Sequence, residues 1–131
     1  VYYFYAYFQM STKLNFSVPT GNFGDVYAGY IAKKMGLPID KLIVATNEND
    51  ILCRVINSGE YKPSHVKPSL SPSMDIQVAS NFERLLFDIL NGDDQKVIKS
   101  MKFKSVSRYH IGILSFIISS AYVDWVQITA S

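Results

Sequence analysis

The sequence predicts an α/β fold in which a parallel sheet is flanked by helices. Strand-like segments at residues 14–18 and 41–46 are each followed by a segment with helical spacing of apolar residues. Hydrophobic residues make up 48% of the 131-residue chain and charged residues 18%, as is typical of a globular protein. Alternation of strand and helix favours parallel strands joined by right-handed crossovers.

The first nine residues, VYYFYAYFQ, are almost all aromatic or apolar and carry no charge. They are fewer than the roughly 20 residues that span a bilayer, and they lack the basic flank of a signal peptide, so no membrane association is expected. We interpret them as the last turns of a buried helix. Because the chain starts at Val1, we expect it to be cut from a longer protein.

The next elements form one strand–helix–strand unit. The strand at residues 14–18 ends at Pro19, and apolar residues at helical spacing follow over residues 25–35. Gly36 and Pro38 are typical of a helix end. The β-branched run at residues 41–46 predicts a buried parallel strand.

A polar turn, NEND at residues 47–50, precedes a helical pattern at residues 51–59. For Asn49 and Asp50 we favour capping of that helix, and for Asn47 we keep open a role in a substrate pocket. Residues 60–79, rich in proline and serine, predict a long loop with a short strand at residues 75–78. The turn that contains Gly21 and Gly24, called the glycine turn below, and NEND each follow a strand. They are therefore expected at the same edge of the sheet.

A further helix is predicted from residue 80 to the Asn91-Gly92 pair. Ser80 and Glu83 have capping-box spacing, and Arg84 and Asp88 are spaced as a surface ion pair. Its apolar stripe comprises Phe82, Leu85, Leu86 and Ile89. The apolar run at residues 111–123 is short for a membrane span and predicts a buried helix or strand.

Charge and cysteine content exclude some classes of function. The net charge is +2, from 13 basic and 11 acidic residues, and no basic cluster suggests nucleic acid as a partner. Cys53 is the single cysteine, so no internal disulfide is possible and a cytoplasmic location is expected. We interpret Cys53 as a small buried residue, and His65 and His110 as surface residues without metal-ligand spacing.

The glycine turn between the first strand and the first long helix has two interpretations. Gly21 and Gly24 either give the backbone freedom to turn a corner or let it approach an anion at the helix N-terminus. On the second interpretation the Asp25 side chain turns away and caps the helix. The Walker and dinucleotide glycine patterns are absent, so a single phosphate on a small cofactor fits better.

Two long strings carry a family resemblance: VPTGNFGDVYAGYIAKKMGLPIDKLIVATNENDIL and SPSMDIQVASNFERLLFDIL. They resemble threonine synthase, a pyridoxal-phosphate enzyme of the tryptophan-synthase-β-like fold type II. The resemblance covers roughly residues 1–100. It implies that pyridoxal 5′-phosphate is the cofactor and that O-phospho-L-homoserine and water are converted to L-threonine and phosphate. The residues that it places around the cofactor phosphate are Gly21, Asn22, Phe23, Gly24 and Asp25.

The chain departs from the family pattern in one essential respect. The Ser-Phe-Lys-Asp-like motif of the Schiff-base lysine does not occur, and Lys33 and Lys34 are interpreted as solvated helix charges, so no catalytic residue is assigned. Residues that approach the substrate's own phosphate are sought among Ser71, Ser73, Asn81 and Arg84.

We divide the chain into a partial cofactor-binding catalytic domain at residues 1–105 and a segment at 106–131 that does not match the family. Such a chain is expected to be inactive alone. The alternatives are a non-catalytic phosphate-ester-binding module and an inactive gene fragment. The sequence does not indicate an oligomeric state.

Overall fold

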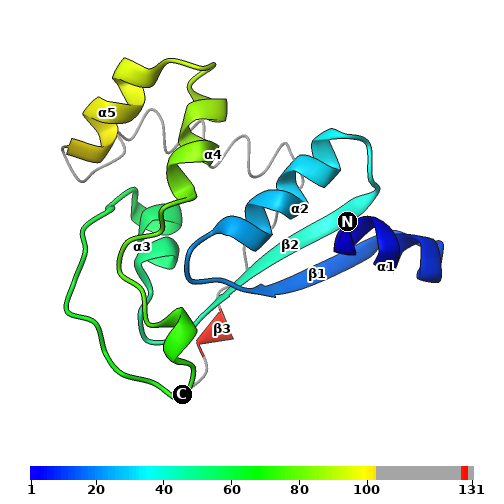
Figure 1. Ribbon diagram of the computed structural model, residues 1–131, viewed down its shortest axis with the longest axis horizontal. Helices are drawn as coiled ribbons and strands as arrows, with labels where there is room; N and C mark the ends of the chain where they lie inside the picture. The colour runs from blue at the N-terminus through cyan, green and yellow to red at the C-terminus, as the bar shows by residue number, and fades with distance from the viewer. Residues whose placement is uncertain (103–127, 130–131) are drawn as a thin grey trace.

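The structure is a computed structural model that describes residues 1–102 and 128–129 (Figure 1). The predictions for His110, for the apolar run at 111–123 and for most of the segment 106–131 lie outside the described residues. Within residues 1–102, no helix is long and apolar enough to cross a membrane.

The predicted α/β class is confirmed. Strands β1 (Leu14–Pro19), β2 (Ile39–Thr46) and β3 (Ile128–Thr129) form a parallel sheet in the order β1-β2-β3. β1 and β2 are in register at their carboxyl ends, where Val18 pairs with Val44 and Pro19 with Ala45. The chain therefore leaves β1 and β2 at the same edge of the sheet, as expected.

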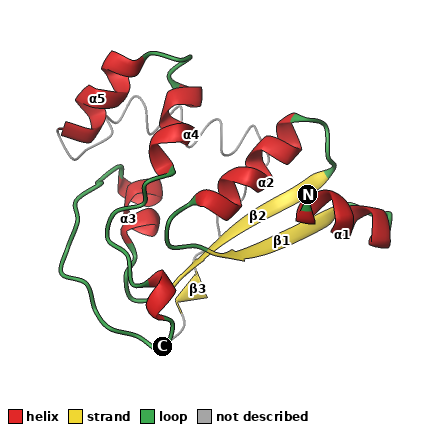
Figure 2. Ribbon diagram, in the orientation of Figure 1, coloured by secondary structure: helices red, strands yellow, loops and turns green. Residues whose placement is uncertain are grey.

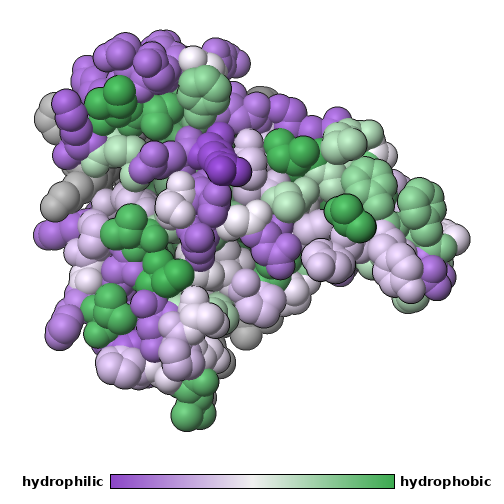
Figure 3. All heavy atoms as spheres, in the orientation of Figure 1, coloured by the Kyte–Doolittle hydropathy of each residue, from purple (hydrophilic) through white to green (hydrophobic). Residues whose placement is uncertain are grey.

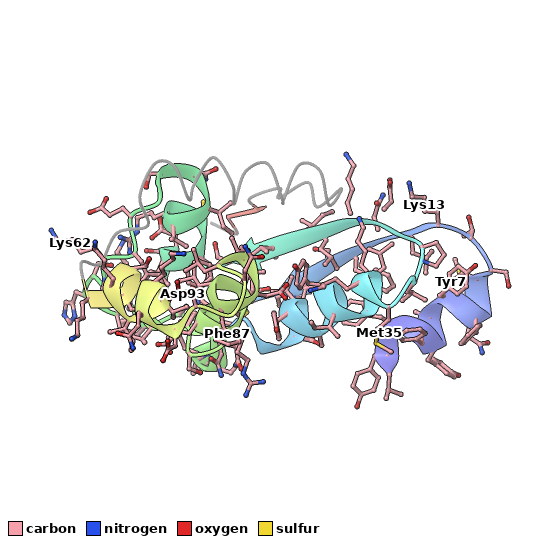
Figure 4. The ribbon with its side chains drawn as sticks, turned by 90° about the horizontal axis from the view of Figure 1, so that it is seen from above. Tyr7, Lys13, Met35, Lys62, Phe87 and Asp93 are labelled. Atoms are coloured by element: carbon pink, nitrogen blue, oxygen red, sulfur yellow. The ribbon has the colours of Figure 1, made fainter. Side chains whose placement is uncertain are left out.

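Helices α1 (Tyr2–Met10) and α2 (Gly24–Lys34) lie on the same side of the two long strands (Figures 1 and 4). Val26 of α2 and Leu42 of β2 are both fully buried. Helix α1 meets α2 at Gly29, where an added Cβ would lie 2.8 Å from the Tyr3 ring.

The prediction of a helix at the start of the chain is confirmed, but the prediction that it is buried is wrong. In α1, Tyr3 is 6% exposed, whereas Tyr5 is 65% and Phe8 68% exposed. Aromatic residues occupy all sides of this helix, so one side meets α2 and the others remain uncovered by the described residues.

Two further predicted helices are confirmed as α3 (Ile51–Ser58) and α4 (Phe82–Ile89). The structure also has the 3₁₀ turn η1 (Pro72–Met74) and helix α5 (Asp94–Lys102), which the sequence patterns do not predict. Gly59 ends α3 with a left-handed φ of 75°. The predicted apolar stripe of α4 is confirmed, since all four of its residues are buried. Figure 2 shows the loop from α3 to α4, interrupted by η1, beside the ends of β1 and β2.

The prediction of a strand at residues 75–78 is wrong, because these residues pair with no strand in the described part of the chain. Their polar side chains bond to other segments instead. Asp75 accepts hydrogen bonds from Asn47, Asn49 and Ser69. Gln77 accepts one from Arg54 at 3.1 Å. Side-chain hydrogen bonds to other segments therefore take the place of the backbone strand pairing that the alternation of polar and apolar residues at 75–78 suggested.

Three predicted helix caps are also wrong. The Ser80 hydroxyl donates to Asn22, and α4 has no side-chain cap. At the start of α3, Asp50 makes no capping bond and instead accepts from Arg54 at 2.9 Å, while Asn49 bonds to Lys67. Helix α2 starts after Phe23 with no side-chain cap, so Asp25 does not cap it. Ser80 and Asn49 thus bond to partners distant in sequence, and Asp50 to a residue one turn along α3.

The predicted Arg84–Asp88 ion pair is wrong as well. The Asp88 carboxylate accepts hydrogen bonds from Tyr30 and from Lys34, whose Nζ lies 2.7 Å from Oδ1. These contacts fasten α4 to α2. Lys34 is thus paired rather than merely solvated, and the Lys33 ammonium donates to the carbonyl of Asp40 at 3.2 Å.

Candidate functional site

The glycine turn occupies residues 20–24 at the carboxyl end of β1. The Thr20 N–H donates to the carbonyl oxygen of Ala45 at 2.8 Å and so extends the strand pairing by one residue. Gly21 follows directly, and α2 begins at Gly24. The turn is therefore anchored to the sheet at one end and to the first turn of a helix at the other.

Both glycines of the turn are needed for space rather than for an unusual backbone angle. A Cβ on Gly21 would lie 3.2 Å from the Met74 Cα, and one on Gly24 would lie 3.2 Å from the Asn81 Nδ2. Neither glycine has a positive φ. The left-handed residue is Phe23, at φ 67°.

Phe23 holds the turn in place from inside the core. Its side chain is 2% exposed and its ring meets that of Phe82 edge to face, with centroids 5.6 Å apart. The Phe82 ring in turn stacks on Tyr61. Burial of the large Phe23 ring offsets the cost of its left-handed backbone. The family resemblance places Phe23 around the cofactor phosphate, and its side chain anchors the turn in the core.

Several backbone N–H groups of the turn carry no hydrogen bond to any described residue. They belong to Gly21, Asn22, Gly24, Asp25 and Val26. The last three form the first turn of α2, whose dipole places partial positive charge there. The hydroxyl of Thr46, at the end of β2, is also buried without a partner among the described residues. This donor set suits an anion such as a phosphate.

Asn22 connects the turn to the start of α4. Its side-chain Oδ1 accepts from both the N–H and the hydroxyl of Ser80. Its carbonyl oxygen accepts from the N–H and the Nδ2 of Asn81, each at 3.2 Å. Both oxygens of Asn22 are therefore committed to the protein, which leaves its N–H groups for a ligand.

A second polar cluster lies at the carboxyl end of β2. Asn47 donates through Nδ2 to the Ser69 hydroxyl at 2.9 Å and to Asp75 at 2.8 Å, and its Oδ1 accepts from the N–H of Asn49. Hydrogen bonds from Ser69 hold the pKa of Asp75 below its usual value, against a smaller opposing effect of desolvation.

Sequence reasoning missed Ser69 and Asp75. The only available signal was a polar run after a strand, followed by a long loop with polar residues. That pattern does not identify which loop residue meets the strand end.

The other candidate residues are distributed around the turn. The carbonyl oxygen of Ser73 lies 3.5 Å from the position of a Gly21 Cβ, and Asn81 faces Gly24. Arg84 is exposed, and among the described residues no acceptor bonds to its guanidinium. No contact in the described residues brings Ser71 to the turn.

The remaining titratable candidates show no site chemistry of their own. Cys53 is buried, as predicted, and burial raises the pKa of its thiol. His65 is exposed. The described residues contain no group of three or more histidine, cysteine, aspartate or glutamate side chains placed to hold a metal ion.

An apolar groove of about 870 Å³ runs between α1 and α2. Figure 3 shows apolar side chains gathered over α1 and the adjoining part of α2, and Figure 4 shows Met35 at the end of α2 next to α1. The lining residues include Phe4, Tyr5 and Phe8 of α1 and Tyr27, Ile31 and Met35 of α2. Gly24 and Arg84 lie at its edge, so the groove reaches the first turn of α2.

No protein-family model matches the chain. It is 56% identical over 104 residues to threonine synthase of Pseudomonas aeruginosa, covering 77% of this chain and 22% of that enzyme. It is 58% identical over 106 residues to threonine synthase of Saccharomyces cerevisiae, covering 72% of this chain and 21% of that enzyme. The chain thus spans about a fifth of the length of these curated relatives.

The fold is similar to solved threonine synthases over nearly the whole chain. The pyridoxal-phosphate-bound enzyme of Brucella melitensis superimposes with a TM-score of 0.84 at 44% identity, over 98% of this chain and 28% of that one. The yeast enzyme gives 0.79 at 44% identity, over 99% and 28%. The sequence and structural comparisons agree on the same family.

Proposed function

The chain belongs to the threonine synthase family, and from this premise we propose that it forms the part of such an enzyme that holds the phosphate of pyridoxal 5′-phosphate. This proposal rests on backbone N–H groups that have no hydrogen-bond partner among the described residues, namely those of Gly21, Asn22, Gly24, Asp25 and Val26. The likeness to a threonine synthase solved with this cofactor supports the identity of the anion.

Five consecutive residues would hold the cofactor phosphate: Gly21, Asn22, Phe23, Gly24 and Asp25. The backbone N–H groups of the turn and of the first turn of α2 donate to the phosphate oxygens. Phe23 fixes the turn from the core, and Asn22 ties it to α4. Ser73, Met74 and Ile76, which face Gly21, leave no space for a larger side chain there, so the donors keep their places.

We propose the family reaction for the whole enzyme, namely conversion of O-phospho-L-homoserine and water to L-threonine and phosphate. The bound cofactor acts as the electron sink, and the residues described here bind and orient it. No lysine of this chain is assigned as the cofactor anchor, because the Ser-Phe-Lys-Asp-like motif of the family does not occur in it. Lys33 and Lys34 are engaged in contacts of α2. A cytoplasmic location is also proposed, since Cys53 is a free buried thiol.

A chimera tests the activity. The matching segment of the Pseudomonas aeruginosa enzyme is replaced by residues 1–102 of this chain, and threonine and phosphate release from O-phospho-L-homoserine are measured. An active chimera supports the proposal. A folded chimera that binds pyridoxal 5′-phosphate but forms no threonine would favour the non-catalytic phosphate-ester-binding alternative.

Gly21→Ala in the chimera tests the site itself. The new Cβ would meet Met74 and Ile76 at 3.2 and 3.1 Å, so the turn must move away from η1. We expect a rise of about tenfold in the Kd of pyridoxal 5′-phosphate, equivalent to about 1.4 kcal/mol.

Gly36→Ala is the matched control for Gly21→Ala, at the opposite end of α2. It strains a left-handed backbone at φ 98° in open space, far from the turn. The Kd should therefore stay at the parent value. Equal Kd values for the two variants would contradict the proposed phosphate turn.

A further inference from the structure

Asp75 is a point where several segments converge, although it is not part of the glycine turn. Its Oδ1 accepts from the Ser69 hydroxyl at 2.6 Å, from Asn47 at 2.8 Å and from Asn49 at 3.2 Å. Its Oδ2 accepts from the Ser69 N–H at 2.8 Å. One carboxylate thus joins the end of β2 to two parts of the long loop.

The residues just before Asp75 form the wall against Gly21. The N–H of Met74 donates to Ser71, and that of Asp75 donates to Pro72, which closes the 3₁₀ turn η1. A Cβ on Gly21 would lie 3.2 Å from the Met74 Cα and 3.1 Å from the Ile76 Cδ1. The residues flanking Asp75 on both sides therefore touch the glycine turn.

Together these contacts form a closed circuit from the end of β2 through the glycine turn and the residues around Asp75 back to the end of β2. Thr20 is bonded to the end of β2 through Ala45, and Gly21 abuts Met74. The Asp75 carboxylate accepts a hydrogen bond from Asn47, which directly follows β2. A loop closed in this way has fewer conformations than one anchored at its ends alone, so the position of the turn depends on the carboxylate.

We propose that Asp75 is a positioning residue that sets the glycine turn for phosphate binding, through η1 and the end of β2. The inference rests on the proposed function and deepens it. A carboxylate is required because the side chain of Asp75 accepts four hydrogen bonds and donates none. In an Asp75→Asn variant, the amide nitrogen would face a donor and lose at least one of these bonds.

The first experiment measures position without a ligand. Amide NMR spectra of the 131-residue chain are compared for the parent, Asp75→Asn and Asp40→Asn. Asp40 is the matched control, because it lies on β2 near the opposite end and pairs with Lys13 at 2.8 Å. We expect Asp75→Asn to shift the amide signals of Gly21 and Asn22, and Asp40→Asn to leave them in place.

The second experiment measures binding. Pyridoxal 5′-phosphate is titrated into the chimera carrying each substitution, and the ³¹P signal of the bound phosphate is recorded. We expect a rise of about tenfold in Kd and a changed ³¹P shift for Asp75→Asn, with parent values for Asp40→Asn. At saturating cofactor, kcat should return towards the parent value, which a general loss of structure would not allow.

The possible outcomes distinguish failure of this inference from failure of the proposed function. If the parent chimera binds no pyridoxal 5′-phosphate, the proposed function fails and the inference fails with it. If the parent binds but Asp75→Asn leaves both the Gly21 signal and the Kd unchanged, the inference alone is overturned. Should Asp75→Asn not fold, Ser69→Ala removes one hydroxyl donor and should give a smaller shift of the same kind.

Discussion

The Asp88 carboxylate shows how a single residue fastens two helices. It accepts hydrogen bonds from Tyr30 and Lys34 of α2, which lie 58 and 54 positions away in the sequence. Desolvation raises the pKa of Asp88, but the hydrogen bonds from Lys34 and Tyr30 outweigh it and hold this pKa below its usual value. The charged form therefore favours the folded state.

The contribution of Asp88 to stability should depend on pH in one direction. Because its pKa is lower in the folded state, the contribution is present above the unfolded pKa of about 3.9 and is lost as the pH falls through the folded value. We expect Asp88→Asn to lower the free energy of unfolding by up to about 1 kcal/mol at pH 7, since the pair with Lys34 is partly exposed.

Urea unfolding between pH 7 and pH 3 checks this dependence. The difference between the parent and Asp88→Asn should shrink towards zero at the acid end. Glu48→Gln is the control, because Glu48 and Lys67 form an exposed pair with both side chains more than half accessible, at 64% and 65%. A parent–Asp88→Asn difference that stayed constant with pH would refute the role of the charge.

At the scale of elements, the buried residue of α1, Tyr3, joins this helix to the rest of the fold. The Tyr3 ring lies over Gly29 of α2, and its hydroxyl donates to the carbonyl oxygen of Asp25 at 2.9 Å. The same ring meets Phe16 of β1 edge to face. A glycine at residue 29 therefore allows one aromatic side chain to join a helix to the sheet.

We expect Gly29→Ala to destabilise the fold although alanine favours helices. The new Cβ would lie 2.8 Å from the Tyr3 ring and 2.9 Å from a Leu42 methyl carbon, so α1 or the core must shift. Overpacking of this kind costs about 1–3 kcal/mol, more than the gain of about 1 kcal/mol in helix propensity. Urea unfolding of the 131-residue chain measures the net effect.

A double variant separates the clash from other effects at this position. With Tyr3→Ala already present, Gly29→Ala should cost less, because the ring is gone while the close contact with the Leu42 methyl carbon at 2.9 Å remains. Equal costs in both backgrounds would show that the Tyr3 contact is not what requires a glycine.

At the scale of the whole molecule, four segments meet at one edge of the sheet. The glycine turn follows β1 and contacts η1 and the start of α4. Asn47 follows β2 and bonds to Asp75, directly after η1. A ligand held there by backbone donors binds only when these segments are assembled. Binding and folding should therefore be coupled.

Pyridoxal 5′-phosphate should raise the stability of the folded 131-residue chain. At a free concentration one hundred times its Kd, the expected gain in the free energy of unfolding is about 2.7 kcal/mol. Thermal unfolding with and without the cofactor measures it. Asn22→Ala should reduce the gain by freeing the turn from Ser80, whereas Asn15→Ala, at an exposed site on β1, should keep it. No gain in the parent chain would argue against the site.

The sequence by itself determined the fold class and the order of β1, α2, β2, α3 and α4, but it did not indicate η1 or α5. Apolar spacing defined the three helices and a compact β-branched run defined β2, because these signals depend on neighbours along the chain. The glycine turn was located for the same reason. Its assignment to a cofactor phosphate came from the family resemblance and remains a proposal.

The tertiary structure alone decided which polar groups pair. Asp88 bonds to α2 instead of Arg84, Ser80 bonds to Asn22 instead of capping α4, and Asp75 gathers the donors at the end of β2. The reason is that a side-chain hydrogen bond depends on a position in space, and folding brings together residues far apart in sequence. Local patterns offer nearby partners, whereas the folded chain supplies distant ones with better geometry.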